Sequence, residues 1–175
     1  MTFTVGFVTG ATPDKWARVW RERSRERLEL VPVAEDAQLD GVRDGSQSMA
    51  LVRLPVDREG LHLIPLYDEL PVAVMSVDNT LTLLDEVTRD DLAGEHQDWA
   101  GLALADVVAT VAAGTGVVVV PMSVARLHHR KDVTYRTVTD LPSTTVGLAW
   151  RVDDEDERVQ AFIGIVRGRT ERSSR

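Results

Sequence analysis

Residues 3–14 read Phe-Thr-Val-Gly-Phe-Val-Thr-Gly-Ala-Thr-Pro-Asp, and this stretch decides the class of fold. Apolar side chains alternate with polar or small ones from Phe3 to Val8, which is typical of a β-strand. A turn of small residues follows, after which Pro13 suits the first position of a helix, with Thr12 as its N-cap. A strand that leads through a tight turn into a helix indicates an α/β protein.

The same order continues in the next forty residues. Trp16, Val19 and Trp20 recur at helical spacing, so the helix that starts near Pro13 presents an apolar face to a core or to another subunit. Gly45 then ends a second helix, because glycine readily adopts the left-handed conformation of a C-terminal cap. Strands joined by helices pair in parallel through right-handed crossovers. We therefore predict a parallel sheet built from a strand at 28–33, a helix at 35–44 and a short buried strand at 49–52, in addition to the first strand and helix.

The pattern changes after residue 55. Two extended runs, 61–67 and 70–76, are separated only by Asp68-Glu69, which is too short for a crossover helix. We interpret the first run as a connector that leaves one lobe for a second. The remaining elements that we predict are a helix with an apolar stripe at 104–111 ended by Gly114, a buried strand at 116–120, a short helix from Pro121 to about Leu127, a return connector at 133–138, a strand at 145–151 and a last helix reaching Val166.

Composition restricts the kind of protein. Hydrophobic residues make up 43% of the 175, enough for a packed core. The net charge of −8 argues against general attraction to nucleic acid or to anionic lipid, and the basic clusters near Arg21 and Arg130 are interpreted as solvated helix ends. No apolar run approaches the ~20 residues of a membrane span. Because the first residues also lack the basic leader of a signal peptide, we expect a cytoplasmic protein.

The residue pattern gives little support to catalysis. The sequence contains no cysteine, no Gly-x-Ser-x-Gly elbow and no His-Glu-x-x-His motif. His128 and His129 are adjacent, so they cannot face one metal from the same side of a helix. No nucleophile can be placed beside a base and an orienting group. We therefore expect no enzyme, no catalytic residue, no metal site and no cofactor.

Three motifs in the same order resemble those of a known family. They are Gly45-Ser-Gln-Ser-Met-Ala-Leu-Val-Arg53, Leu63-Ile-Pro-Leu-Tyr-Asp-Glu-Leu-Pro-Val-Ala-Val74 and Ala112-Ala-Gly-Thr-Gly-Val-Val-Val-Val-Pro121. Over about residues 3–167 the chain resembles the effector-binding domain of LysR-type transcription regulators. The resemblance implies an α/β, two-lobed fold of the type II periplasmic-binding-protein kind. It also implies a ligand of the organic-carboxylate class.

The sequence departs from the family pattern at three places. Ser48 stands where the family usually has an aspartate, and the segment from Leu92 to Gly114 is short, which predicts a shortened second lobe. No helix-turn-helix precedes the first strand, so we expect a stand-alone form with no direct DNA binding. The lobes that we predict are residues 1–54 with 141–167 for the first, and 55–140 for the second, with crossing segments at about 61–69 and 133–140 and a disordered tail at 168–175.

The candidate ligand-binding residues follow from the order of the elements. In open α/β sheets a ligand lies beyond the carboxyl ends of the strands, where helix N-termini offer amides to an anion. Arg53 adds a guanidinium with the fork geometry that suits a carboxylate. We therefore predict a small anionic ligand with an apolar body, held in a cleft. The candidate residues are Thr9, Gly10, Ala11, Thr12, Arg53, Leu54, Pro55, Pro121, Met122 and Ser123.

Each of these residues also has a structural interpretation. Thr12 and Pro13 can simply begin a helix, and Pro121 can do the same for a later helix. Arg53 can pair with a nearby acid instead of with a ligand. The sequence leaves both interpretations open.

Two functions remain after these exclusions. The first is a cytoplasmic small-molecule sensing domain that acts in transcription regulation through a partner, such as a DNA-binding regulator. The alternative is a dimerisation module with a vestigial cleft, which forms mixed dimers with full-length regulators. Both predict a homodimer, with the helix of Trp16 and Trp20 in one subunit against the stripe of Leu104 to Val111 in the other. Neither involves a membrane.

Overall fold

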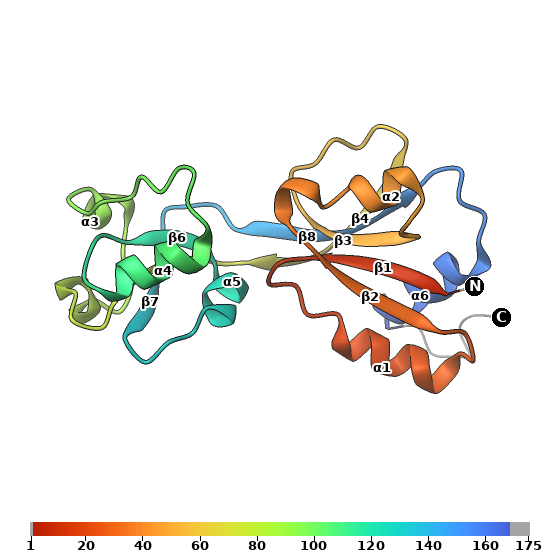
Figure 1. Cartoon of the computed structure of the whole chain (residues 1–175), viewed down its shortest axis with the longest axis horizontal. Helices are drawn as coiled ribbons and strands as arrows, with labels where there is room; N and C mark the ends of the chain where they lie inside the picture. Colours follow the sequence, from red (N-terminus) through yellow and green to blue (C-terminus); the bar gives the residue numbers. More distant parts are fainter. Residues whose placement is uncertain (1, 169–175) are drawn as a thin grey trace. The chain divides into compact units, whose positions relative to one another are not determined.

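The computed structural model describes residues 2–168, which divide into two compact units. Unit 1 contains the described residues up to Tyr67 and from Thr145 onward, and unit 2 contains Asp68–Thr144 (Figure 1). The tail predicted at 168–175 lies outside the described residues, apart from Gly168. Within the described part, no helix is both long enough and apolar enough to span a bilayer.

Unit 1 is built on a five-stranded sheet in the order β2-β1-β3-β8-β4. Strand β1 pairs in parallel with both β2 and β3, as the strand-helix alternation predicts. Strand β8 is antiparallel to β3, so the whole sheet is mixed. The elements of this sheet and its helices are β1 (Phe3–Val8), α1 (Asp14–Arg23), β2 (Leu28–Val33), η1 (Glu35–Ala37), α2 (Asp40–Asp44), β3 (Met49–Arg53), β4 (Leu61–Glu69), β8 (Thr144–Arg151) and α6 (Glu157–Val166).

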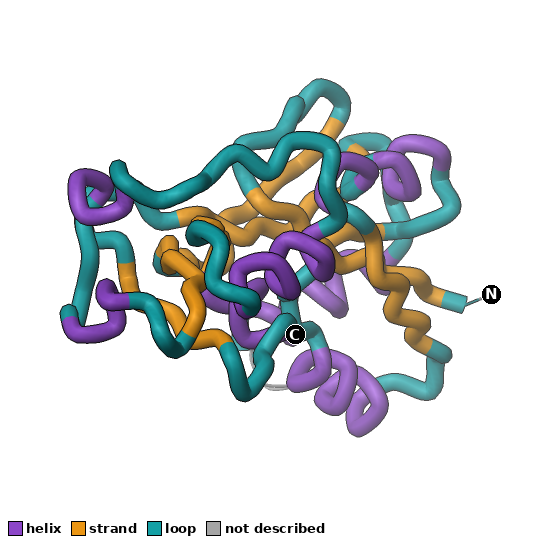
Figure 2. Tube along the Cα trace, turned by 60° about the vertical axis from the view of Figure 1, so that its left-hand side comes forward, coloured by secondary structure: helices purple, strands orange, loops and turns teal. Residues whose placement is uncertain are grey.

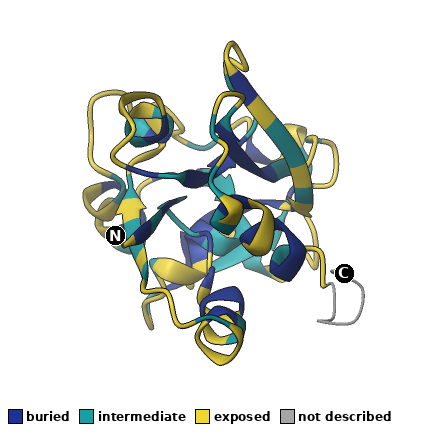
Figure 3. Cartoon of the chain, turned by 90° about the vertical axis from the view of Figure 1, so that its right-hand side faces the viewer, coloured by how far each residue is buried: buried dark blue, intermediate teal, exposed yellow. Residues whose placement is uncertain are grey.

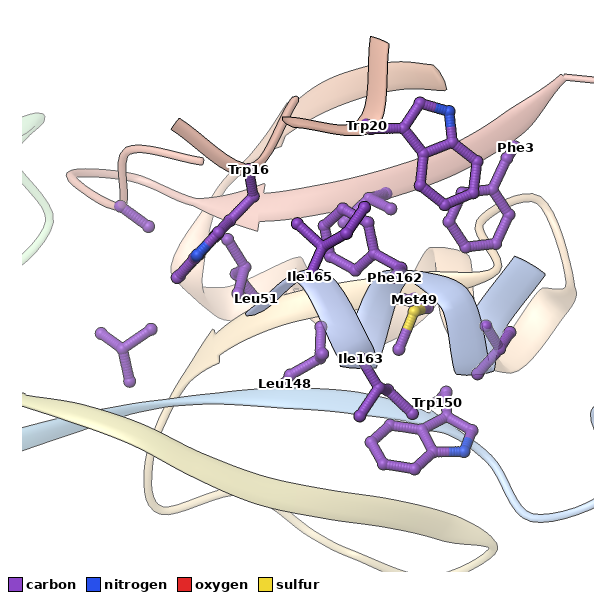
Figure 4. Close-up of a cluster of buried hydrophobic side chains, with 14 of the residues drawn as sticks. Phe3, Trp16, Trp20, Met49, Leu51, Leu148, Trp150, Phe162, Ile163 and Ile165 are labelled. Carbon is purple, nitrogen blue, oxygen red and sulfur yellow. The ribbon is translucent and has the colours of Figure 1, made fainter. Parts of the chain in front are cut away.

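The main core of unit 1 lies between this sheet and helices α1 and α6. Trp20 is 1% exposed and its ring stacks on Phe3, with 5.0 Å between the ring centroids. Phe162 of α6 packs against both rings at 6.0 Å (Figure 4). The Trp20 indole N–H donates to the carbonyl of Glu26 at 2.8 Å, so its one polar group is satisfied. The apolar face of α1 therefore packs into the core of its own chain. The apolar spacing of Trp16 and Trp20 is explained by this packing and gives no separate reason to place them at a dimer contact.

A smaller core covers the opposite face of the same sheet. It contains Val42 of α2 together with Ala50, Val52, Leu61 and Ala149 from the strands. Because successive side chains of β3 point to opposite faces, all five of its residues are buried. Figure 3 shows that the loops are mostly exposed, whereas buried, half-buried and exposed residues all occur along the strands.

Helix α1 begins one residue later than the sequence predicts. Its N-cap is Pro13, with no side-chain cap hydrogen bond, so Thr12 does not cap the helix. The turn before it is closed by the amide of Ala11, which donates to the carbonyl of Val8 at 3.0 Å. Gly10 has φ 91° in this turn, a conformation that glycine adopts without strain. The turn is thus closed by the backbone alone, and the first amides of α1 receive no side-chain cap.

Unit 2 has a three-stranded antiparallel sheet in the order β6-β5-β7. Two predictions need correction here. The strand after Gly116 was expected to be fully buried, but β6 is an edge strand and is mostly half-buried. The return connector predicted at 133–138 is largely strand β7, which pairs with β5. The elements are β5 (Pro71–Ser76), η2 (Thr80–Leu83), α3 (Arg89–Leu92), α4 (Leu104–Ala112), β6 (Val118–Pro121), α5 (Met122–Leu127) and β7 (Val133–Thr137).

A loop protects the beginning of the β6 edge. The backbone carbonyl of His96 accepts from the amide of Val117 at 3.0 Å, and the indole N–H of Trp99 donates to the Val117 carbonyl at 2.8 Å. Both backbone groups of Val117 are therefore paired without a neighbouring strand. Much of the segment between β5 and α4 runs as loop (Figure 2). This loop therefore provides the hydrogen-bond partners of Val117 just before β6.

Candidate functional site

The loop after β1 lies at the carboxyl end of that strand, where α/β proteins place their ligands. Thr9 and Gly10 are half-buried, Ala11 is buried and Thr12 is exposed. The Thr9 hydroxyl donates to the carbonyl of Val33, at the end of the neighbouring β2, over 3.4 Å. The exposed Thr12 hydroxyl is thus carried on a loop whose other residues are held by the sheet.

Arg53 sits at the carboxyl end of β3 and reaches back to this loop. Its guanidinium donates to the carbonyl of Thr9 at 3.0 Å and lies 3.6 Å from a carboxylate oxygen of Glu35. The side chain is only 3% exposed, whereas that of Glu35 is 59% exposed. The guanidinium therefore joins the ends of β1 and β3. Its ion pair with Glu35 agrees with the interpretation that Arg53 pairs with an acid of the protein.

The backbone of Arg53 is held as firmly as its side chain. The Gln38 side-chain amide donates to the Arg53 carbonyl at 2.9 Å, and its oxygen accepts from the Arg53 amide at 2.8 Å. Gln38 is itself buried, so this pair of bonds replaces a neighbouring strand at the end of β3. Next along the chain, Leu54 is half-buried and Pro55 is exposed, and the Leu54 amide donates to the carbonyl of Thr145.

The candidate residues of unit 2 lie where β6 passes into α5. Pro121, Met122 and Ser123 are all half-buried. The amide of Met122 donates to the carbonyl of Leu70 at 2.9 Å, so one of the first amides of α5 already has a partner. The hydroxyl of Ser123 donates to the carboxylate of Glu69, which is buried. The Glu69 carboxylate therefore accepts the hydrogen bond from Ser123 at the start of α5, where the sequence predicts an anionic ligand.

Sequence reasoning found the loops but missed the side chains that organise them. In unit 1 the Arg53 guanidinium donates to the Thr9 carbonyl, and Gln38 and Glu35, for which the local pattern gives no signal, also contact Arg53. In unit 2 it joins Ser123 to Glu69, a residue that the sequence suggested only as a spacer between two extended runs. Among residues 2–168, no three side chains of the His, Cys, Asp or Glu type gather as a metal site would require.

The order of the elements and the two sheets can now be compared with known proteins. A sequence model described as the LysR substrate binding domain matches residues 3–97, more than half of the chain. The chain belongs to the LysR substrate-binding domain family. The resemblance seen in the three motifs is therefore confirmed. No curated protein matches the chain by sequence.

Solved structures of regulators have the same fold. An OxyR regulatory domain from Pseudomonas aeruginosa matches with a TM-score of 0.78 and 21% identity, covering 95% of this chain and 96% of that one. The effector-binding domain of a BenM variant matches with a TM-score of 0.79 and 18% identity, covering 97% of each chain. Full-length BenM matches at 0.78 and 17% identity, covering 98% of this chain and 70% of that one. At these identities the comparison establishes the fold alone, which is the two-lobed type II periplasmic-binding-like fold.

Proposed function

We propose that this LysR-family domain senses a small organic anion and acts in transcription regulation through a partner. The observation that carries the proposal is the Thr9–Thr12 loop at the carboxyl end of β1. It presents an exposed hydroxyl at Thr12, and the buried Arg53 is bonded to its backbone at Thr9. A loop held this firmly loses little conformational freedom when a ligand binds, which favours affinity.

The candidate residues would have different roles in ligand binding. Thr12 contacts the ligand, because its hydroxyl is exposed and does not cap α1. Arg53 acts as a positioning residue, since its guanidinium already donates to the Thr9 carbonyl and it is nearly inaccessible. Leu54 and Pro55 supply apolar contact beside it. The unit 2 candidates, Pro121, Met122 and Ser123, form a separate group, and there the Glu69 carboxylate favours a hydrogen-bond donor over an anion.

The partner in this proposal makes the contact with DNA. The net charge of −8 over 175 residues opposes phosphate, so direct binding to nucleic acid is not proposed. The proposed setting is the cytoplasm, and the proposed assembly is a homodimer, in line with the oligomers that LysR regulator domains form. The burial of Trp16 and Trp20 in the unit 1 core argues against these two side chains as interface contacts.

A second candidate function is a dimerisation module that no longer binds a ligand and forms mixed dimers with full-length regulators. The observation that favours it is the Glu69 carboxylate beside Ser123, because a buried negative charge repels an anion at this place.

Thermal denaturation with a panel of organic anions tests the first function, because a ligand that binds only the native state raises the Tm. We expect Thr12→Ala to leave the ligand-free Tm unchanged and to reduce the ligand-induced shift. Arg53→Ala should lower the ligand-free Tm instead, since it leaves the Thr9 carbonyl without its donor. Arg18→Ala, on the exposed side of α1, is the control.

Two results would argue against sensing. One is the absence of any Tm shift across the panel. The other is an equal ligand-induced shift in the parent and in Thr12→Ala. Light scattering that shows a mixed complex with a full-length regulator, in the absence of any small molecule, would favour the dimerisation module.

A further inference from the structure

Unit 2 contains a pocket that none of the candidate residues lines. It has a volume of about 540 Å³ and lies between helix α5 and the face of the sheet formed by β5 and β7. This volume falls within the range of pockets that bind small molecules, roughly 300–1,000 Å³. The residues that matter for its chemistry are Val74, Ala125, Arg126, His129, Val133 and Tyr135.

The apolar part of the pocket is made by buried side chains. Val74 of β5 is 4% exposed and Val133 of β7 is 8% exposed, and Ala125 of α5 is buried beside them. Tyr135 is the direct cross-strand partner of Val74, so its ring lies on the same face of the sheet. These four residues belong to one hydrophobic cluster, which makes the wall rigid.

The rim is polar and carries positive charge. The guanidinium of Arg126 donates through Nε to the hydroxyl of Tyr135 at 3.4 Å, a long bond that leaves most of its donors for another group. Within residues 2–168 no carboxylate forms an ion pair with Arg126, whereas Arg130 pairs with Asp132 at 2.9 Å. His129 lines the same rim and adds a ring nitrogen. One arginine, one phenol and one imidazole therefore surround an apolar hollow.

The length of α5 explains why the hollow is open. The helix contains only six residues and ends at Leu127, and the chain then turns through His128–Lys131 before β7 begins. At 3.6 residues per turn, so short a helix covers only part of this face, and α4 packs on the same hydrophobic cluster. Beyond the end of the helix Tyr135 stays half-buried, beside the exposed Arg126.

We propose that this pocket binds a carboxylate attached to a flat apolar body, such as an aromatic acid. The body contacts Val74, Ala125 and Val133, and the carboxylate accepts from Arg126 and from the Tyr135 hydroxyl. Guanidinium groups suit carboxylates because two parallel N–H groups match the two oxygens. The site lies entirely within unit 2 and uses none of the residues in the proposed sensing loops, so it stands independently of that proposal.

The test uses the full chain labelled with ¹⁵N and two probes of the same shape, 2-naphthoate and its uncharged analogue 2-naphthamide. Amide shifts during titration locate the site, and their concentration dependence gives Kd. We expect the shifts to centre on Val74, Ala125 and Val133, with naphthoate binding at least tenfold more tightly than naphthamide.

The variants identify the groups that bind the carboxylate. Arg126→Gln should weaken naphthoate about tenfold, the lower end for a hydrogen bond to a charged group, because the rim is exposed. Tyr135→Phe should weaken it about threefold. Arg18→Gln makes the same change of charge on an exposed site of α1 and should leave Kd unchanged. An unaltered amide spectrum away from the pocket shows that each variant is folded.

Three results would overturn the proposal. The first is an equal affinity for naphthamide and naphthoate, which would mean that the arginine adds nothing. The second is an unchanged Kd in Arg126→Gln. The third is a set of shifts that centres on unit 1, which would place the probe at the loops there.

Discussion

At the scale of single residues, Asp156 combines two interactions at the start of α6. Its carboxylate caps the helix by accepting from the amide of Arg158 at 2.9 Å, and it accepts from the Arg158 guanidinium at 2.7 Å. The hydrogen bonds from the Arg158 side chain are the main cause that lowers the pKa of Asp156, and desolvation opposes them. Arg158 also lies over the ring of Phe3, with 5.4 Å between them. The cap therefore ties α6 to the aromatic core.

We expect Asp156→Ala to lower the free energy of unfolding by about 1 kcal/mol, the usual contribution of an N-cap. The pKa of Asp156 in the folded protein lies below its unfolded value of about 4. The ion pair with Arg158 therefore stabilises the folded state fully above that pH. Its contribution is lost as the pH falls through the folded value. Asp156→Asn keeps a cap acceptor but does not titrate, so it should lose less than the alanine variant at pH 7.

Urea denaturation of the three proteins between pH 2 and pH 7 measures both effects. The difference in unfolding free energy between the parent and Asp156→Asn should shrink as the pH drops below about 4. A difference that stayed constant over this range would mean that the carboxylate does not titrate with a lowered pKa.

At the scale of elements, the edge of β6 depends on one glycine. Gly116 has φ 69°, and a Cβ placed on it would overlap the backbone carbonyl of His96. That carbonyl is the group that accepts from Val117 and protects the edge. Gly114, two residues earlier, has φ 101° but open space around it. An alanine at Gly114 would meet only the strain of a positive φ, whereas an alanine at Gly116 would also clash with the His96 carbonyl.

We expect Gly114→Ala to cost more than about 1 kcal/mol through its positive φ alone. Gly116→Ala should cost clearly more than this control, because it also pushes the His96 loop off the β6 edge. Thermal denaturation compares the two variants, and faster hydrogen exchange at Val117 should appear only in the second. Equal losses in both would show that the contact with His96 contributes nothing.

At the scale of the whole molecule, the two units have separate hydrophobic cores. The clusters around Trp20 and Val42 draw only on unit 1, and those around Val111 and Met75 draw only on unit 2. Local stability follows the apolar contacts that a region buries. The two units should therefore respond separately to damage in their cores.

The prediction is tested by Val111→Ala in unit 2 and Leu148→Ala in unit 1, two residues with no exposure. We expect losses of about 2 kcal/mol for the valine and about 3 kcal/mol for the leucine. Native-state hydrogen exchange should show the loss mainly in the unit that carries the change. If either variant weakened protection equally in both units, the chain would unfold as a single cooperative body.

The sequence by itself predicted most of the strands and helices, because periodicity, glycine stops and proline starts act over a few neighbouring residues. It did not separate η1 from α2 or recognise β7 as a paired strand. The parallel order of β1, β2 and β3 also followed, since helices join them. Local pattern could not decide that β8 runs antiparallel to β3 or that β6 is an edge, because strand pairing joins residues far apart in the chain. Nor could it place Arg53 against Thr9, 44 positions away, or Glu69 against Ser123, 54 positions away. The tertiary structure decided those contacts, and with them the chemistry of the candidate site, because buried polar groups must find partners wherever the fold supplies them.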